Sequence, residues 1–292
     1  MIELLIRAII AGTPLLLASL GELITERSGV LNLGVEGAFV LGVAAGYVST
    51  VITGNAYIGL LVGGIAGALI GLIHGLVSVC FRAHQVISGL ALTMFGYGLA
   101  SLFGRVYVGI PLPTYLLTDR IWYIILVLSV IFSLVLWYMI FKLKLGVIIR
   151  SVGENPYSAS VLGVDVVKVR VLCTVIGSFM VGVGGAWFTL GYLHIWTEGL
   201  GMGRGWISLA IVIVAGWNPI LAPVFSYLFG CVEAAIWTLQ LPPYNIDPFI
   251  LGMLPYIVTL VALTIFMATP LKKFLKPPAA LGYVYFREER TV

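Results

Sequence analysis

KLKLGVIIRSVGENPYSASVLGVDVVKVR, residues 142–170, is the longest polar stretch between the hydrophobic segments of this chain. It carries five Lys and Arg, whereas the segments on either side are almost entirely apolar. Five apolar runs precede it and four follow it. A structured connection of this kind, outside the hydrophobic segments, is the first candidate for a surface on which a partner docks.

The composition is that of a polytopic membrane protein. Hydrophobic residues make up 61% of the 292 residues, charged residues only 10%, and the mean hydropathy is +1.11. Soluble domains carry roughly a quarter charged residues. The net charge of +4 does not indicate nucleic-acid binding, because the basic residues lie at the ends of apolar runs, where they set topology. We expect no nucleic-acid partner.

Apolar runs can be compared with the roughly 20 residues that a helix needs to cross a bilayer. They predict an all-α polytopic fold of about nine transmembrane helices, some of them broken. The N-terminal segment is expected to be the first span, because Glu3 precedes its apolar core and it has no clear cleavage site. The predicted spans are 2–25, 33–51, 57–80, 86–108, 121–141, 169–195, 206–217, 220–239 and 249–269.

The distribution of basic residues predicts the orientation of the chain. With nine spans, the ends at 26–32, 81–85, 142–168 and 270–292 fall on one side of the membrane. Twelve of the sixteen Lys and Arg lie in or beside these ends. Cytoplasmic ends carry an excess of Lys and Arg. We therefore expect the N-terminus outside and the C-terminus in the cytoplasm.

Two glycine-rich segments are expected to interrupt the membrane helices. The run 206–217 has only 12 residues, about 18 Å of helix against about 30 Å of hydrocarbon, and glycines flank both of its ends. Segment 33–51 is also rich in glycine. Freed backbone groups are tolerated in a membrane only against protein or along a water-filled path. The candidate path residues are Asn32, Glu36, Gly203, Arg204, Trp206 and Asn218. Structural ion pairing is the alternative role for Glu36 and Arg204.

These two segments align with each other. Residues 34–37 can be laid over 203–205, and Asn55 over Asn218, at a nearly constant offset. Five spans separate equivalent helices, so the two copies insert in opposite senses, as in the inverted repeats of many transporters. The alternative is a chance likeness between two glycine-rich apolar segments.

A short helix near 156–162 is predicted inside the polar stretch. Asn155 caps free N–H groups, Pro156 suits the first turn, and Gly163 ends the helix. The helix carries apolar side chains away from the membrane spans, where they can enter a groove of a partner. A connector lying on the surface is the alternative.

Several motifs together resemble one transporter family. They are ERSGVLNLGVEG at 26–37, RSVGENP at 150–156 with LGV at 162–164, the segment 199–206, and the tail PPAALG at 277–282 with FREER at 286–290. The chain is similar over nearly its whole length to the permease subunits of ABC importers of the branched-chain amino acid, ribose and nucleoside type. The tail resembles the nucleoside and simple-sugar branch.

The resemblance implies one permease domain over residues 1–292 and a cytoplasmic coupling loop at 142–168. That loop transmits ATP-driven motion from an ATPase subunit. The residues implied in coupling are Arg150, Gly153, Glu154, Asn155, Pro156, Tyr157, Ser158, Leu162 and Gly163. The other implied partners are a second homologous permease subunit in a heterodimer, an extracytoplasmic substrate-binding lipoprotein, membrane lipid and a small-molecule substrate. The binding protein is expected to dock near 109–120 and 196–205. The implied location is a bacterial plasma (inner) membrane, with several passes.

The chain is not expected to be an enzyme. It contains no G-x-x-x-x-G-K-[ST] motif, and no lysine follows a glycine, so ATP hydrolysis is assigned to the partner. No catalytic, metal or cofactor site is predicted, and the three cysteines lie inside apolar runs as packing thiols. Two other classes remain open. An ion-gradient-driven secondary transporter would use acidic residues such as Glu36, and a passive channel would not need the capped helix.

Overall fold

The computed structural model describes residues 2–116, 118–268 and 276–286, and this part of the chain is helical without any strand. The long helices are α1 (Ile2–Arg27), α2 (Val35–Thr53), α3 (Ala56–Gly75), α4 (Gln85–Gly104), α5 (Thr118–Lys142), α8 (Val166–Trp187), α10 (Ala222–Gln240) and α12 (Leu254–Ala268). Shorter helices are α6 (Lys144–Glu154), α7 (Pro156–Val161), α9 (Arg204–Val214) and α11 (Pro248–Gly252). The π-helical turns Leu76–Cys80 and Phe188–Leu193 extend α3 and α8, and the 3-10 turn Arg105–Tyr107 extends α4.

Eight helical stretches among the described residues are long and apolar enough to cross a membrane. The ninth predicted span, 206–217, corresponds to α9, which has 11 residues and is too short to cross alone. The predicted all-α polytopic fold is therefore confirmed, and the expected number of about nine spans is close. The expectations for Lys272, Lys273 and residues 287–290 of the tail lie outside the described residues.

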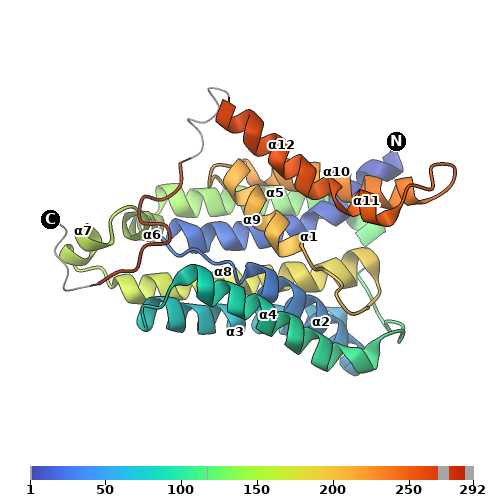
Figure 1. Ribbon diagram of the computed structural model, residues 1–292, viewed down its shortest axis with the longest axis horizontal. Coiled ribbons are helices and arrows are strands. Elements are labelled where there is room, and N and C mark those ends of the chain that lie inside the picture. The colour runs from blue at the N-terminus through green and yellow to red at the C-terminus, as the bar shows by residue number, and fades with distance from the viewer. Residues whose placement is uncertain (1, 117, 269–275, 287–292) are drawn as a thin grey trace.

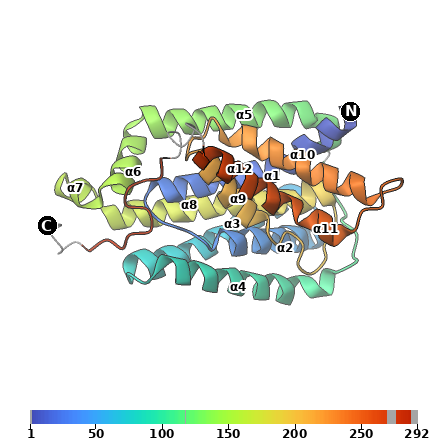
Figure 2. The same ribbon diagram turned by 45° about the horizontal axis from the view of Figure 1, so that its top comes forward.

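Helices α1 and α8 form the middle of the molecule, and Figure 2 shows α4 and α5 on opposite flanks. Figure 1 shows α6 and α7 at one end and the start of α1 at the other. Residues 27–31, 82–85, 141–170 and 276–286 meet at the first of these ends, which is called the α7 end below.

Glycine lets α2, α3 and α8 pack with their backbones in contact. A side chain on Gly182 of α8 would collide with the main chain of Gly63 and Gly67 on α3, and one on Gly42 of α2 would collide with Gly182. Lipid tails are as apolar as leucine, so burial alone does not drive membrane helices together. Close packing of small residues supplies much of the attraction.

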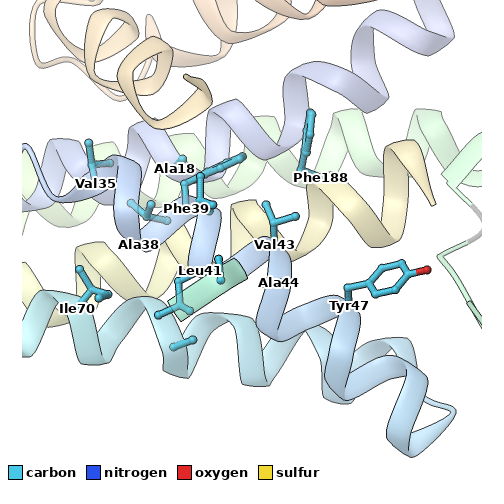
Figure 3. Packing of buried hydrophobic residues seen from close by; sticks show 14 of the residues in the cluster. Ala18, Val35, Ala38, Phe39, Leu41, Val43, Ala44, Tyr47, Ile70 and Phe188 are labelled. Carbon is cyan, nitrogen blue, oxygen red and sulfur yellow. The ribbon is translucent and has the colours of Figure 1, made fainter. Parts of the chain in front are cut away.

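Aromatic and aliphatic side chains fill the remaining space between these helices. Phe39 of α2 lies 5.9 Å from Phe188, measured between ring centroids, and both side chains are almost completely buried. Figure 3 shows Phe39 in this cluster with Ala18, Val43 and Ile70, which come from α1, α2 and α3. The cluster makes these helices one rigid frame.

The position of one break differs from the expectation. Segment 33–51 was expected to contain a broken helix, but α2 runs without interruption from Val35 to Thr53. The interruption lies before it, at residues 28–34, where Gly29 has a φ of +89°. The glycines inside α2 serve packing instead, as Gly37 and Gly42 lie against α4 and α8.

We expect Gly182→Val to destabilise the protein by about 1–3 kcal/mol or more, because the added side chain separates α8 from α3. The matched control is Gly98→Val on α4, where nothing lies within 4 Å of an added Cβ atom. The measurement is the thermal unfolding midpoint of each variant purified in detergent. Equal midpoints for the two variants would contradict this packing.

Candidate functional site

The N-terminus of α9 is capped by a carboxylate from another helix. Glu36, in the first turn of α2, is fully buried and accepts hydrogen bonds from the main-chain N–H groups of Gly203 at 2.5 Å and Trp206 at 3.1 Å. The hydroxyl of Tyr97 donates to the same carboxylate at 2.6 Å. The free N–H groups and the dipole of a helix N-terminus favour an anion at this place.

The local sequence explains why a distant residue provides this cap. The residue before α9 is Gly203, which has no side chain to cap the helix, and its φ of +87° suits glycine. A side chain at Gly205 would occupy the place of the Glu36 backbone and carboxylate. The glycines at 203 and 205 therefore make room for α2 to approach the start of α9.

Charged side chains also hold the other end of α9. The guanidinium of Arg27 donates to the carbonyl of Trp217, in the turn after the helix, through Nε at 3.0 Å and Nη2 at 2.7 Å. The Trp217 indole donates to Glu26 Oε2 at 2.6 Å. All three side chains are buried. The last carbonyls of α9 are capped by the turn itself, since the N–H groups of Ala215, Gly216 and Trp217 donate to the carbonyls of Ile211, Ile213 and Val212. Arg27 and Glu26 hold this turn in place.

Arg204, the first residue of α9, forms an ion pair with α10 rather than with Glu36. Its Nη2 lies 2.6 Å from Glu233 Oε1, and its guanidinium lies 5.2 Å from the centre of the Phe188 ring. Glu233 is only 4% exposed. The structure thus brings Glu36, Gly203, Arg204 and Trp206 together at the start of α9.

Asn32 and Asn218 lie apart from this group. The Asn32 amide donates to Glu22 Oε2 at 3.2 Å and Ser178 Oγ at 3.4 Å, between α1 and α8. Asn218 lies beyond the other end of α9, where its side chain accepts the N–H of Ile220 at 3.0 Å and shapes the turn before α10.

The short helix expected at 156–162 is α7, Pro156–Val161. Asn155 Oδ1 accepts the N–H of Ser158 at 2.9 Å, and Gly163 ends the helix with a φ of +87°. Pro156 and Ala159 are buried, whereas Val161 and Leu162 are 87% and 83% exposed. Two exposed apolar side chains thus lie in or directly after α7, which Figure 1 shows at one end of the bundle.

Three predicted coupling residues fix α6 to its neighbours. Arg150 donates to the carbonyl of Ile140 at 3.1 Å. The Gly153 carbonyl accepts the N–H of Ala280 at 2.9 Å, and Glu154 Oε2 accepts the N–H of Ala279 at 3.2 Å. The preceding helix is therefore tied both to the end of α5 and to the C-terminal segment.

Residues 277–286, called the strap below, cross the α7 end. The Tyr283 carbonyl accepts hydrogen bonds from Arg170 at 2.9 Å and Gln85 at 3.3 Å. Tyr285 packs on Tyr157 of α7 with ring centroids 5.3 Å apart. The strap thus joins α7 to α8 and α4, and the side chain of Tyr157 forms part of this contact.

The sequence reasoning missed several residues of this arrangement. Glu22 and Glu26 were not singled out, although two acidic residues four positions apart in an apolar helix are a rare and costly feature. Nothing in the sequence near Tyr97 or Trp217 indicates their hydrogen-bond partners, which lie 61 and 191 residues away. No group of side chains suited to a metal ion occurs within the described ranges.

Comparison with known proteins gives a consistent result. The family model "Branched-chain amino acid transport system / permease component" matches residues 4–263. The provisionally named glucose ABC transporter permease protein TsgC13 of Haloferax volcanii is 37% identical, over 96% of this chain and 90% of the relative. Two guanosine ABC transporter permease proteins of Bacillus subtilis are also similar. NupQ is 30% identical over 97% of this chain and 96% of the relative, and NupP is 28% identical over 79% and 72%. No solved structure matches.

We expect Glu36→Ala to destabilise α9, because it strands buried N–H groups at a cost of about 1–3 kcal/mol each. Glu36→Gln retains one acceptor oxygen, and its stability is expected to lie between that of the unmodified protein and that of Glu36→Ala. Both are compared by thermal unfolding in detergent with Glu198→Ala, which alters an exposed glutamate.

A local measurement accompanies this prediction. Ser208→Cys places a thiol at a fully buried position of α9, in a background without the three natural cysteines. Maleimide should label it faster in Glu36→Ala than in the Glu198→Ala control. Equal labelling rates would show that Glu36 does not hold the helix.

Proposed function

This chain belongs to the family of permease components of branched-chain amino acid transport systems, and from this membership we propose its cargo, partners and coupling residues. It is a permease subunit of an ABC importer and a multi-pass protein of the plasma (inner) membrane. Members of this family are not themselves enzymes and work with ATPase and substrate-binding partners. In our proposal, residues 1–292 form one permease domain.

The proposed cargo is a nucleoside such as guanosine, or a simple sugar. Its support is the naming of the similar relatives, which are permeases for guanosine and glucose. A cargo of this kind is neutral and rich in hydroxyl groups. We propose that Asn32, Glu36, Gly203, Arg204, Trp206 and Asn218 border half of the path, with alternating access between the two sides of the membrane.

The second permease subunit is proposed to be a different, longer relative. This chain covers 96% of NupQ but only 72% of NupP, although both are guanosine permeases of one organism. The presence of a shorter and a longer guanosine permease in one organism favours a heterodimer. An extracytoplasmic lipoprotein would deliver the cargo near residues 109–120 and 196–205, and the N-terminus would be outside.

The observation that carries the coupling proposal is the exposed apolar side of α7 at an end rich in basic residues. We propose that the ATPase subunit hydrolyses ATP and docks there on the cytoplasmic side. Within loop 142–168, Asn155, Pro156, Ser158 and Gly163 shape the helix. Tyr157 and Leu162 offer contact surface. Arg150, Gly153 and Glu154 pass the motion to neighbouring segments, to which they are bonded.

The first test is uptake of radiolabelled guanosine, uridine, ribose and glucose by cells with and without this chain. Nucleoside or sugar uptake should disappear in the deletion strain. A variant with Asn155→Gly and Pro156→Gly should lose most uptake, because the cap and the fixed first turn of α7 are removed together.

Three other results would change the proposal. Unchanged uptake of all four solutes in the deletion strain would exclude this cargo class. Uptake that depends on an ion gradient and ignores the α7 variant would favour a secondary transporter. Uptake that depends neither on an ion gradient nor on an intact α7 would favour a passive channel. Membrane levels of each variant are measured by immunoblot so that lost protein is not mistaken for lost coupling.

A second prediction concerns the strap. Tyr285→Ala removes the ring that packs on Tyr157, and we expect uptake to fall several-fold while the chain remains in the membrane. Tyr283→Ala is the matched control, because the Tyr283 side chain is 68% exposed and holds the strap only through its carbonyl. Equal uptake by the two variants would remove the strap from the coupling pathway.

A further inference from the structure

A cavity of about 250 Å³ lies between α9, α10 and the segment formed by α11 and α12. Its polar wall comes from Arg204, Glu233, Gln240 and Tyr256, and its apolar wall includes Ile207 and Ile236. Pockets that enclose drug-sized ligands have volumes of about 300–1,000 Å³. This cavity therefore suits a single moiety, such as one sugar ring, better than a whole nucleoside.

The polar wall is held in place before any solute arrives. The guanidinium of Arg204 binds Glu233 Oε1 at 2.6 Å through Nη2 and the Met202 carbonyl at 3.1 Å through Nη1. The Phe188 ring lies 5.2 Å from the guanidinium. Fixing of this kind lowers the entropy that would be lost when a ligand binds.

The charge of this wall selects for a neutral solute. Arg204 and Glu233 already neutralise each other, so an anion or a cation would have to compete with one of them for the other. A hydroxyl group adds to the pair without separating it. A carboxylate has about four lone-pair positions, and the ion pair occupies one at Glu233 Oε1. The lone-pair positions of Glu233 that remain can accept hydrogen bonds from two adjacent O–H groups.

The rest of the lining fits the same chemistry. Gln240 and the Tyr256 hydroxyl can both donate and accept, as a sugar hydroxyl does. Ile207 and Ile236 provide apolar surface for the less polar face of a ring. Tyr256 also touches α9, because a side chain added at Gly203 would meet the Tyr256 hydroxyl. A solute in this cavity thus contacts the same turn of α9 that Glu36 caps.

We propose that this cavity is a transient subsite for the sugar of the cargo, in which Glu233, oriented by Arg204, accepts hydrogen bonds from a vicinal diol. The inference rests on the proposed nucleoside or sugar cargo and specifies which part of that cargo the permease itself recognises. The subsite favours a ribose over a 2′-deoxyribose, since the latter offers no vicinal 2′,3′-diol.

The test compares uptake of guanosine and 2′-deoxyguanosine at saturating concentrations in cells that keep all partner subunits. The ratio of the two maximal rates is determined for the unmodified chain and for Glu233→Gln. The binding protein is the same in both strains, so its own preference cancels when the ratios are compared. We expect Glu233→Gln to lower the ratio by about threefold to tenfold, the range expected for a lost hydrogen bond.

The matched control is Glu3→Gln. It makes the same change in an exposed ion pair, with Arg7 at 3.1 Å, and should leave the ratio unchanged. Tyr256→Phe removes a hydroxyl of the cavity while retaining the ion pair. It decides the question if Glu233→Gln does not reach the membrane.

The possible failures are distinguishable. Normal guanosine uptake with the same ratio in the unmodified chain, Glu233→Gln and Tyr256→Phe would overturn the subsite and leave the proposed function intact. Uptake of nucleosides and sugars that does not depend on this chain would overturn the proposed function, and the subsite with it.

Discussion

The structure depends on buried charges that hold α9 at its N-terminus and at the turn that follows it. A helix that ends inside the hydrocarbon leaves N–H groups at one end and carbonyls at the other, and each unsatisfied group costs several kcal/mol there. Glu36 accepts from the N–H groups at one end. At the other end the turn at 215–217 caps the last carbonyls with its own N–H groups, and Arg27 holds that turn through the Trp217 carbonyl. Burying these charges is itself expensive, and each is hydrogen-bonded to main-chain groups, Glu36 at the start of α9 and Arg27 in the turn after it.

These caps work only if α1 and α2 stand at fixed positions, and glycine packing provides this. Gly21 of α1 contacts Gly177 of α8, and Gly42 of α2 contacts Gly182 on the same helix. Helix α8 therefore sets the distance between the two helices that hold α9 and the turn after it. Bulkier residues at these positions would move Glu36 and Arg27 beyond hydrogen-bond reach of their partners. The small residues that pack α8 against α1 and α2 therefore determine the polar contacts of α9.

Local signals predicted what depends on nearby residues. Apolar run lengths gave the membrane helices, the short run at 206–217 gave the interrupted helix, and Asn155-Pro156 gave α7. Contacts over long sequence distances could not be derived in the same way. Glu36 and Arg204 were both noticed, but the sequence does not show that Glu36 caps a main chain while Arg204 pairs with Glu233. The internal duplication, the path residues and the coupling roles remain predictions.

Arg27 connects the two regions that the sequence treated separately. Its side chain binds the Trp217 carbonyl in the turn after α9, and its main-chain carbonyl lies where a side chain at Gly153 would be, at the end of α6. The Phe141 ring adds to this contact, because its centroid lies 5.6 Å from the guanidinium of Arg27 and 5.1 Å from that of Arg150. Arg27 is therefore in contact both with the end of α6 and with the turn that follows α9. Since packed interfaces shift between discrete arrangements rather than deform continuously, Arg27 is the contact through which the proposed motion of α6 and α7 would reach the turn after α9.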